Sequence, residues 1–267
     1  MDTERHNTEQ VMQLNQRGGR TLSIADLCLA GTLTPRMAAL CWMRIESGAS
    51  LVTGAVPGGA GKTTLMGALL TFLPPGERIV TVADRAVLDN ALEGSLPRPA
   101  TLLAHEIGSG RWFGYIWGRD AADFFRSGGR GMRCVTCLHT DDPGQTREIL
   151  LPLGVREQDL ARVGLQLYMH RGPRHGHVLH RVTALHCRPD GDLACVTKWN
   201  KKADRHEWQL PAEDLCERLA ATQNSGVTPD DLKEEWDRRT SWVQELVDSE
   251  TVAWQDVRAA VLAYDGR

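Results

Sequence analysis

The sequence predicts an α/β protein whose mostly parallel sheet is extended by antiparallel strands and followed by C-terminal helices. Between residues 51 and 151, short apolar strand-like runs alternate with helix-like stretches, which is typical of a parallel sheet covered on both faces. A glycine-rich loop at 56–64 joins one such strand to a helix. Residues 163–199 contain successive strands separated by short turns, which favour antiparallel pairing. After Pro211 the apolar residues follow helical spacing.

These patterns divide the chain into parts of different character. The expected parts are a flexible tail at 1–20, an N-terminal helical stub at 21–48, an α/β core with added hairpin strands at 49–210 and a C-terminal helical subdomain at 211–267. The expected strands are 51–53, 78–82, 101–104, 133–138, 163–169, 178–187 and 193–199. The expected helices before Pro211 are 22–29, a helix from Thr34-Pro35, 62–73, 119–126 and 145–151.

Composition limits the classes of function that the chain supports. Of 267 residues, 42% are hydrophobic and 24% are charged, which is typical of a globular protein. The net charge of −3 argues against a generally basic nucleic-acid surface, so no nucleic-acid partner is expected. Apolar runs fall far short of the ~20 residues of a membrane-spanning helix, and the polar N-terminus does not resemble a signal peptide. The seven scattered cysteines favour a reduced, cytoplasmic setting.

The glycine-rich segment at 56–64 is the most informative feature. Its glycines allow the backbone N–H groups to face a phosphate chain, and the helix that follows adds its positive end. Lys62 would reach the β- and γ-phosphates of ATP, and the Thr63 hydroxyl would hold Mg²⁺. Val56 stands where the motif has its first glycine. The alternative is that the segment is a glycine-rich connector whose lysine takes no part in phosphate binding. The expected nucleotide-binding residues are Gly58, Gly59, Ala60, Gly61, Lys62, Thr63 and Thr64.

Polar residues follow three of the expected strands. Asp84, Glu106 and His139 each stand at or just beyond the carboxyl end of an apolar run. Ligands gather at that edge of an open α/β sheet, so the three side chains are expected to converge beside the phosphate loop as catalytic residues if their strands are neighbours. Glu106 could polarise water or hold Mg²⁺ through water, and His139 could contact the γ-phosphate. The alternatives are an exposed loop glutamate, a loop-capping histidine and an N-capping or turn aspartate.

Two other patterns invite a metal interpretation. Cys134 and Cys137 lie within an apolar strand, and no second cysteine pair completes a zinc site. Core thiols are therefore the better interpretation. His175, His177 and His180 have spacing that suits a metal, but the surrounding glycines and proline favour a solvent-facing hairpin turn.

Several sequence motifs, in order along the chain from about residue 18, resemble those of the secretion-type ATPases of type II and type IV secretion, type IV pili and the archaellum. The likeness is greatest to the archaeal and VirB11-like branch. His105-Glu-Ile107 resembles its atypical Walker B motif, and Cys137–Asp142 resembles its histidine box. The other matching stretches are Ala49–Leu65, Leu73–Val82, His180–Ala184, Trp199–Asp204 and Arg239–Tyr264.

This resemblance implies a RecA-like core and a hexameric ring in which ATP drives movement between subunits. It implies ATP and Mg²⁺ at the phosphate loop, Glu106 as the Walker B acid and His139 as the histidine-box residue. It also implies a membrane-embedded secretion or pilus platform protein as partner, and a place at the inner face of the membrane. An arginine supplied by a neighbouring subunit would complete the site. The candidates are Arg111, Arg126, Arg130, Arg133 and Arg147.

The chain departs from the family pattern at several positions. Ala83-Asp84 stands where the family has Glu-Asp, and Val56 replaces a glycine. The segment Gly108–Gly118 replaces a short arginine-bearing link, and the large N-terminal domain of the family is expected to be lacking. Two functions follow as hypotheses: an ATP-hydrolysing motor subunit, or a nucleotide-binding switch or scaffold with weak or absent hydrolysis. A third is a different P-loop enzyme, such as a small-molecule kinase or a nucleic-acid motor.

Overall fold

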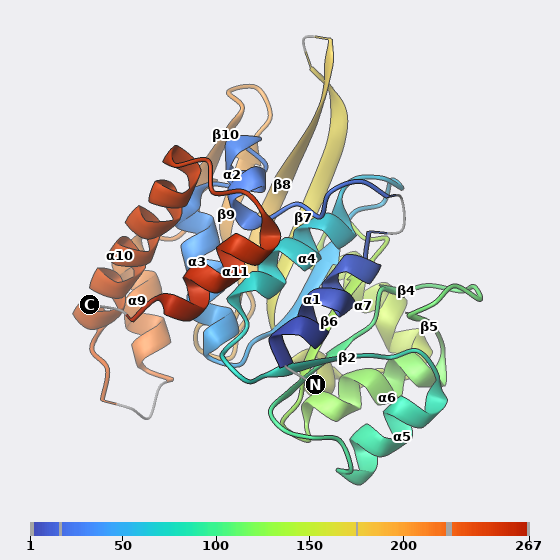
Figure 1. Ribbon diagram of the computed structural model, residues 1–267. Helices are drawn as coiled ribbons and strands as arrows, with labels where there is room; N and C mark the ends of the chain where they lie inside the picture. The colour runs from blue at the N-terminus through green and yellow to red at the C-terminus, as the bar shows by residue number, and fades with distance from the viewer. Residues whose placement is uncertain (1–2, 16–17, 175, 223–225, 266–267) are drawn as a thin grey trace.

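The computed structural model describes residues 3–15, 18–174, 176–222 and 226–265 (Figure 1). The strands are β1 (Ser50–Gly54), β2 (Arg78–Thr81), β3 (Ala100–Leu103), β4 (Glu106–Ile107), β5 (Tyr115–Ile116), β6 (Arg133–Leu138), β7 (Val163–Arg174), β8 (His177–Cys187), β9 (Ala194–Asn200) and β10 (Arg205–Trp208). The α-helices are α1 (Thr3–Gln13), α2 (Ile24–Leu29), α3 (Pro35–Glu46), α4 (Lys62–Leu69), α5 (Arg85–Glu93), α6 (Arg119–Gly128), α7 (Pro143–Leu150), α8 (Glu157–Leu160), α9 (Ala212–Ala220), α10 (Pro229–Asp248) and α11 (Trp254–Ala263). Short 3₁₀ turns follow α4 at Leu70–Phe72 and α7 at Leu151–Leu153.

The described residues form an eight-stranded sheet in the order β10-β9-β8-β7-β1-β6-β3-β2. From β7 to β2 neighbouring strands are parallel, and from β7 to β10 they are antiparallel. Leu51 of β1 is in register with Val135 of β6 on one side and Leu165 of β7 on the other. The strand that feeds the phosphate loop is therefore flanked by sheet on both sides. The arrangement confirms the predicted P-loop α/β fold.

Helices cover both faces of the sheet (Figure 1). Alternate residues of a strand enter different cores: Leu51 joins the core that contains residues of α1 to α4 and α9 to α11, and Val52 joins the core that contains residues of α5 to α8. Cys134 and Val135 of β6 alternate in the same way. Each fully buried side chain of this size contributes about 1.5–3 kcal/mol, so both cores fix the central strands that carry the site.

The expectation of a flexible tail at 1–20 is wrong for its described residues, because residues 3–13 form α1. Asn7 explains much of the difference: its Nδ2 donates to the Glu77 carbonyl and its Oδ1 accepts from the Ile79 N–H, both at 2.8 Å. These bonds fasten α1 to the edge strand β2. The helix also packs on α4, where a Cβ added to Gly67 would lie 3.4–3.5 Å from Leu14 and Val11. Such tertiary contacts decide whether a polar helix forms.

The hairpin of β7 and β8 is longer than the sequence predicts, since β7 continues to Arg174. His177 and His180 lie on β8, whereas His175 lies outside the described residues. Within the part of the chain that the structure describes, no group of three His, Cys, Asp or Glu side chains is placed to hold a metal ion. Cys134 and Cys137 are free and buried in β6, as predicted for core thiols. Burial raises the pKa of Cys134 to about 12.

Among the described residues, no helix combines the length and the apolar character needed to cross a bilayer.

Candidate nucleotide-binding site

The phosphate loop begins where β1 reaches Gly54 and ends where α4 begins at Lys62. Gly61 caps α4 with φ 101°, a left-handed conformation that favours glycine. A Cβ on Gly54 would collide with the Tyr168 ring, so the chain approaches β7 closely as it enters the loop. His180 of β8 donates from Nδ1 to the Ala60 carbonyl at 2.8 Å. The hairpin therefore supports the loop from outside, a role that the sequence did not predict.

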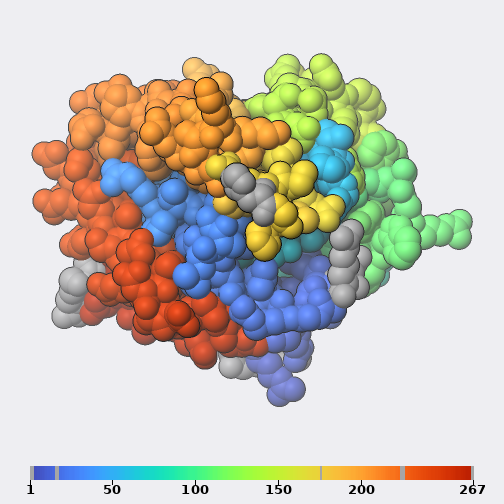
Figure 2. Space-filling model, turned by 90° about the horizontal axis from the view of Figure 1, so that it is seen from above, coloured from blue at the N-terminus to red at the C-terminus, as the bar shows by residue number. Residues whose placement is uncertain are grey.

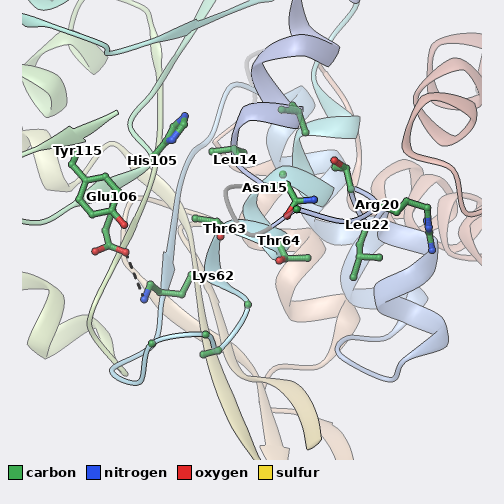
Figure 3. A pocket seen from close by; sticks show the side chains of 18 of the residues that line it. Leu14, Asn15, Arg20, Leu22, Lys62, Thr63, Thr64, His105, Glu106 and Tyr115 are labelled. Carbon is green, nitrogen blue, oxygen red and sulfur yellow. Dashed lines mark ion pairs between the residues drawn. The ribbon is translucent and has the colours of Figure 1, made fainter. Parts of the chain in front are cut away.

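A cavity of about 450 Å³ opens beside this loop (Figure 3). It is lined by the predicted residues Gly58 to Thr64, by Glu106 and His139, and by the segment that follows α1. The positive end of α4 faces the same space because the helix starts at the loop. The cavity thus joins the positive end of a helix to an acidic and an imidazole side chain.

Lys62 is the centre of a compact polar cluster. Its Nζ lies 3.8 Å from Glu106 Oε2, and 3.4 Å from each ring nitrogen of His139. It also donates to the Ala55 carbonyl at 3.4 Å. The side chains of Lys62 and Glu106 are only 6% and 12% exposed, so each charge compensates the other where water is scarce. Figure 3 shows the ion pair at one end of the cavity.

Glu106 reaches the cluster because β3 is followed at once by β4. The short strand β4 pairs with β5, with Glu106 opposite Tyr115. Cys137 of the neighbouring β6 donates its thiol to the His105 carbonyl at 2.9 Å, and its Sγ lies 3.8 Å from Glu106 Oε2. His139, just beyond β6, places Nε2 3.2 Å from Glu106 Oε1. Adjacent parallel strands therefore deliver the acid and the imidazole to one point.

His105 packs beside this cluster in a drier setting. Its ring is buried and meets the Phe113 ring edge-on, with centroids 5.3 Å apart. Burial lowers the pKa of His105 to about 4. The ring is therefore neutral at pH 7, and it adds no positive charge beside Lys62.

The loop after β6 holds Val56 by both of its backbone polar groups. The Val56 N–H donates to Asp141 Oδ1 at 2.8 Å, and the Val56 carbonyl accepts from His139 Nδ1 at 2.8 Å. A residue without glycine's freedom is thus held at the start of the phosphate loop by fixed partners. Asp141 was not among the residues predicted for the site, although its position two residues after His139 was a usable signal.

Asp84 does not join the cluster, so the expected convergence of three strand ends is wrong for this residue. Its carboxylate caps α5, accepting from the Val87 N–H at 3.3 Å, and the side chain is exposed. The reason is strand order: β2 is the edge strand, and β3 and β6 separate it from β1. The alternative of an N-capping aspartate is the one that the structure bears out.

The arginine candidates fall into different environments. Arg133 is buried against Glu77, with Nε–Oε1 and Nη2–Oε2 distances of 2.9 Å, and it donates to the Ala49 carbonyl. Its guanidinium cannot reach another subunit, so Arg133 is removed from the candidates. Arg126 pairs with Asp123, and Arg147 pairs with Glu157. Arg111 and Arg130 are exposed.

Described residues that follow α1 also line the cavity, a role that was not predicted from the sequence. Leu14, Asn15, Arg20 and Leu22 all line it (Figure 3). A flexible tail is not expected to line a cavity, so these residues were not predicted for the site. The usable signal was the spacing of Val11 and Leu14 by nearly one helical turn, which places them on one face of a helix.

Several solved structures are similar to this chain, and three of them are described here. They are the VirB11 ATPase of the Brucella suis type IV secretion system in complex with sulphate, the ATPase DotB of Legionella pneumophila and the ATPase DotB of Yersinia pseudotuberculosis. Their identities are 17%, 11% and 11%, and their TM-scores are 0.42, 0.38 and 0.44. The matches cover 68%, 87% and 91% of this chain but only 64%, 66% and 63% of those chains, which is less than two thirds of each. No protein-family model and no curated protein matches the sequence.

Proposed function

We propose that this chain binds MgATP and hydrolyses it as the motor subunit of a secretion or type IV pilus-like machine. One observation carries the proposal: Lys62, Glu106 and His139 meet in a single cavity at the N-terminal end of α4. A phosphate cradle, an acid and a γ-phosphate sensor are the parts that a P-loop hydrolase needs. Their proximity argues against a connector with an incidental lysine.

Binding begins at the loop, where the N–H groups of residues 58–61 and the end of α4 receive the phosphate chain. Lys62 moves from Glu106 to the β- and γ-phosphates, because a triphosphate offers it more negative charge. Mg²⁺ in such sites takes one or two protein oxygens, with phosphates and waters completing its shell. The Thr63 hydroxyl and, through water, Glu106 are the oxygens that the cavity offers. The bound ion would neutralise phosphate charge.

The movement of Lys62 also frees the Glu106 carboxylate to bind a water molecule. Once its ion pair with Lys62 is broken, the Glu106 carboxylate accepts a hydrogen bond from a water and aligns it with the γ-phosphorus. A bond then forms from the water oxygen to that phosphorus while a proton of the water passes to the Glu106 carboxylate, the bond from the phosphorus to the β–γ bridging oxygen breaks, and ADP and phosphate leave. His139 contacts both Glu106 and the backbone of Val56, so it reports γ-phosphate loss to the phosphate loop.

The proposed working form is a homo-oligomer, with a hexameric ring as the expected state. The loop between β4 and β5 projects from the molecule (Figure 1, Figure 2) and carries the exposed side chains of Trp112 and Phe113 beside Arg111. Exposed aromatic side chains next to an arginine suit a subunit interface. Arg111 is the candidate for an arginine supplied in trans. The proposed partner is a membrane-embedded platform protein, met at the cytoplasmic face of the membrane.

A nucleotide-binding switch or assembly scaffold is the second candidate. Two observations favour it: Asp84 lies outside the cavity, and Ala83 stands where a further carboxylate is expected. Such a protein would bind ATP through Lys62 and release little phosphate. It would change its assembly state with the nucleotide.

Turnover per subunit, measured against protein concentration together with the mass in solution, separates these functions. We expect phosphate release per subunit to rise at least about tenfold as the protein assembles, since an arginine in trans raises hydrolysis strongly. Arg111→Ala should abolish this rise, and Arg5→Ala, on the exposed face of α1, should not. Assembly without phosphate release would favour the scaffold. Phosphoryl transfer that requires an added acceptor would favour a kinase.

A further inference from the structure

The cavity extends well beyond the phosphate end. Lys62 and Glu106 lie at one end, and Asn15 and Leu22 lie on the opposite side of Thr64 (Figure 3). A volume of about 450 Å³ falls in the range of small-ligand sites, and it exceeds what a phosphate chain alone requires. The end that lies away from Glu106 is therefore open to the rest of a nucleotide.

The direction of the bound nucleotide follows from the chemistry of the other end. The attacked γ-phosphate must lie near Glu106, the only acidic side chain among the described residues that line the cavity. The phosphates then run past Lys62 toward Thr64, and the nucleoside leaves the loop on the side of Asn15. The residues after α1 are thus the ones that a base and ribose would meet.

The described residues that follow α1 have contacts of their own. Gly18 and Gly19 adopt left-handed conformations, with φ of 76° and 89°. Arg20 anchors the chain: its guanidinium makes two bonds to Asp26, at 2.7 and 2.5 Å, and one to the Val252 carbonyl at 3.0 Å. Arg20 is thereby occupied with positioning the segment, which leaves recognition to its neighbours.

The neighbours offer an apolar surface and one amide. Leu14 is buried against α4, and Leu22 lines the cavity nearby. The Asn15 side chain points toward Thr64 in Figure 3 and donates one Nδ2 proton to the Gly19 carbonyl at 2.8 Å. A carboxamide carries a second donor proton and an acceptor oxygen. That donor–acceptor pair matches the N6 and N7 edge of adenine, whereas guanine presents two acceptors there.

We infer that the end of α1 and residues 18–22 form the nucleobase subsite of this cavity, with the Asn15 amide reading the edge of adenine. Leu14 and Leu22 cover the apolar part of the nucleoside. The inference rests on the proposed function and adds to it the residues that hold the base and a named residue that selects it.

Titrations with MgATP, MgGTP and magnesium tripolyphosphate test this subsite, because tripolyphosphate has no base. The wild type should bind MgATP more tightly than the other two. Asn15→Ala should weaken MgATP about tenfold, the worth of one or two hydrogen bonds, and should leave tripolyphosphate unchanged. Gln13→Ala is the matched control, since this amide is exposed on α1 and does not line the cavity.

The outcomes separate this inference from the function on which it rests. Equal affinity of the wild type for MgATP and tripolyphosphate would overturn the base subsite and leave the phosphate site standing. Unchanged MgATP affinity in Asn15→Ala would do the same. A wild type that binds none of the three would overturn both. The comparison of ligands on the wild type holds whether or not the variants fold.

Discussion

Replacing Glu106 by glutamine is expected to lower ATP turnover by at least about 10²-fold while MgATP still binds. Glutamine keeps the shape of the side chain but cannot accept the proton of the attacking water. The neighbours that hold the residue, Tyr115 across β5 and Cys137 on β6, are unchanged. Glutamine loses the ion pair with Lys62 but keeps a side-chain oxygen that can accept from a water on Mg²⁺, so MgATP binding should be retained. Phosphate release and equilibrium binding, measured on the same samples, check both parts.

Asp84→Asn is the matched control for this variant. Both changes convert an acid that follows a strand of the parallel sheet into its amide, but Asp84 follows the edge strand β2 and caps α5. ATP turnover of the Asp84→Asn variant should stay within about twofold of the wild type, because no contact with the cavity is lost. A large loss in Asp84→Asn, or full turnover in Glu106→Gln, would contradict the assignment of the acid.

Removing the carboxylate of Glu77 is expected to lower the free energy of unfolding by about 3–5 kcal/mol. Glu77 and Arg133 form a two-bond ion pair with side chains 6% and 4% exposed. Thr101 adds a third bond, at 2.5 Å to Glu77 Oε1. Glu77→Ala would leave the guanidinium of Arg133 buried without its counter-charge at the start of β6, the strand that leads to His139. Urea unfolding of the wild type and the variant measures the loss.

An exposed pair supplies the comparison. Arg147 and Glu157 also make two bonds, but their side chains are 54% and 56% exposed. Glu157→Ala should cost less than about 1 kcal/mol, because water already solvates both groups. Similar losses of stability in Glu77→Ala and Glu157→Ala would mean that burial does not set the strength of these ion pairs.

The sequence predicts the fold well because its signals are local. A glycine loop between a strand and a helix, apolar runs of strand length and the cap at Thr34 act over a few residues. The Thr34 side chain does accept from the Met37 N–H at 3.2 Å. By contrast, α1 depends on Asn7 and its bond to Ile79, which lies 72 residues away in the chain. No local pattern contains that information.

The candidate site also contains residues that local patterns predict and residues whose placement depends on distant parts of the chain. Residues 58–64, Glu106 and His139 lie on β1, β3 and β6 or just after them, and these three strands are adjacent. Asp84 also follows an apolar strand in the sequence, but that strand lies at the edge of the sheet. The local sequence pattern does not predict the order of the strands. Arg133 is a further case, since nothing near it in the sequence predicts that Glu77 would bury its charge.

Calorimetric titration of MgATP into the wild type and Lys62→Ala tests the central claim most directly. Lys62 is the one lysine that lines the cavity among the described residues, where it contacts Glu106 and His139. The wild type should bind one MgATP per chain, and Lys62→Ala should bind at least about 100-fold more weakly, as expected when a charged contact to phosphate is lost. Lys62→Ala should unfold at a lower temperature than the wild type, because Glu106 loses its counter-charge, so both titrations are made at a temperature at which both proteins are folded. Equal MgATP affinity in the two folded proteins would contradict the claim that the glycine-rich loop at 56–64 binds a triphosphate.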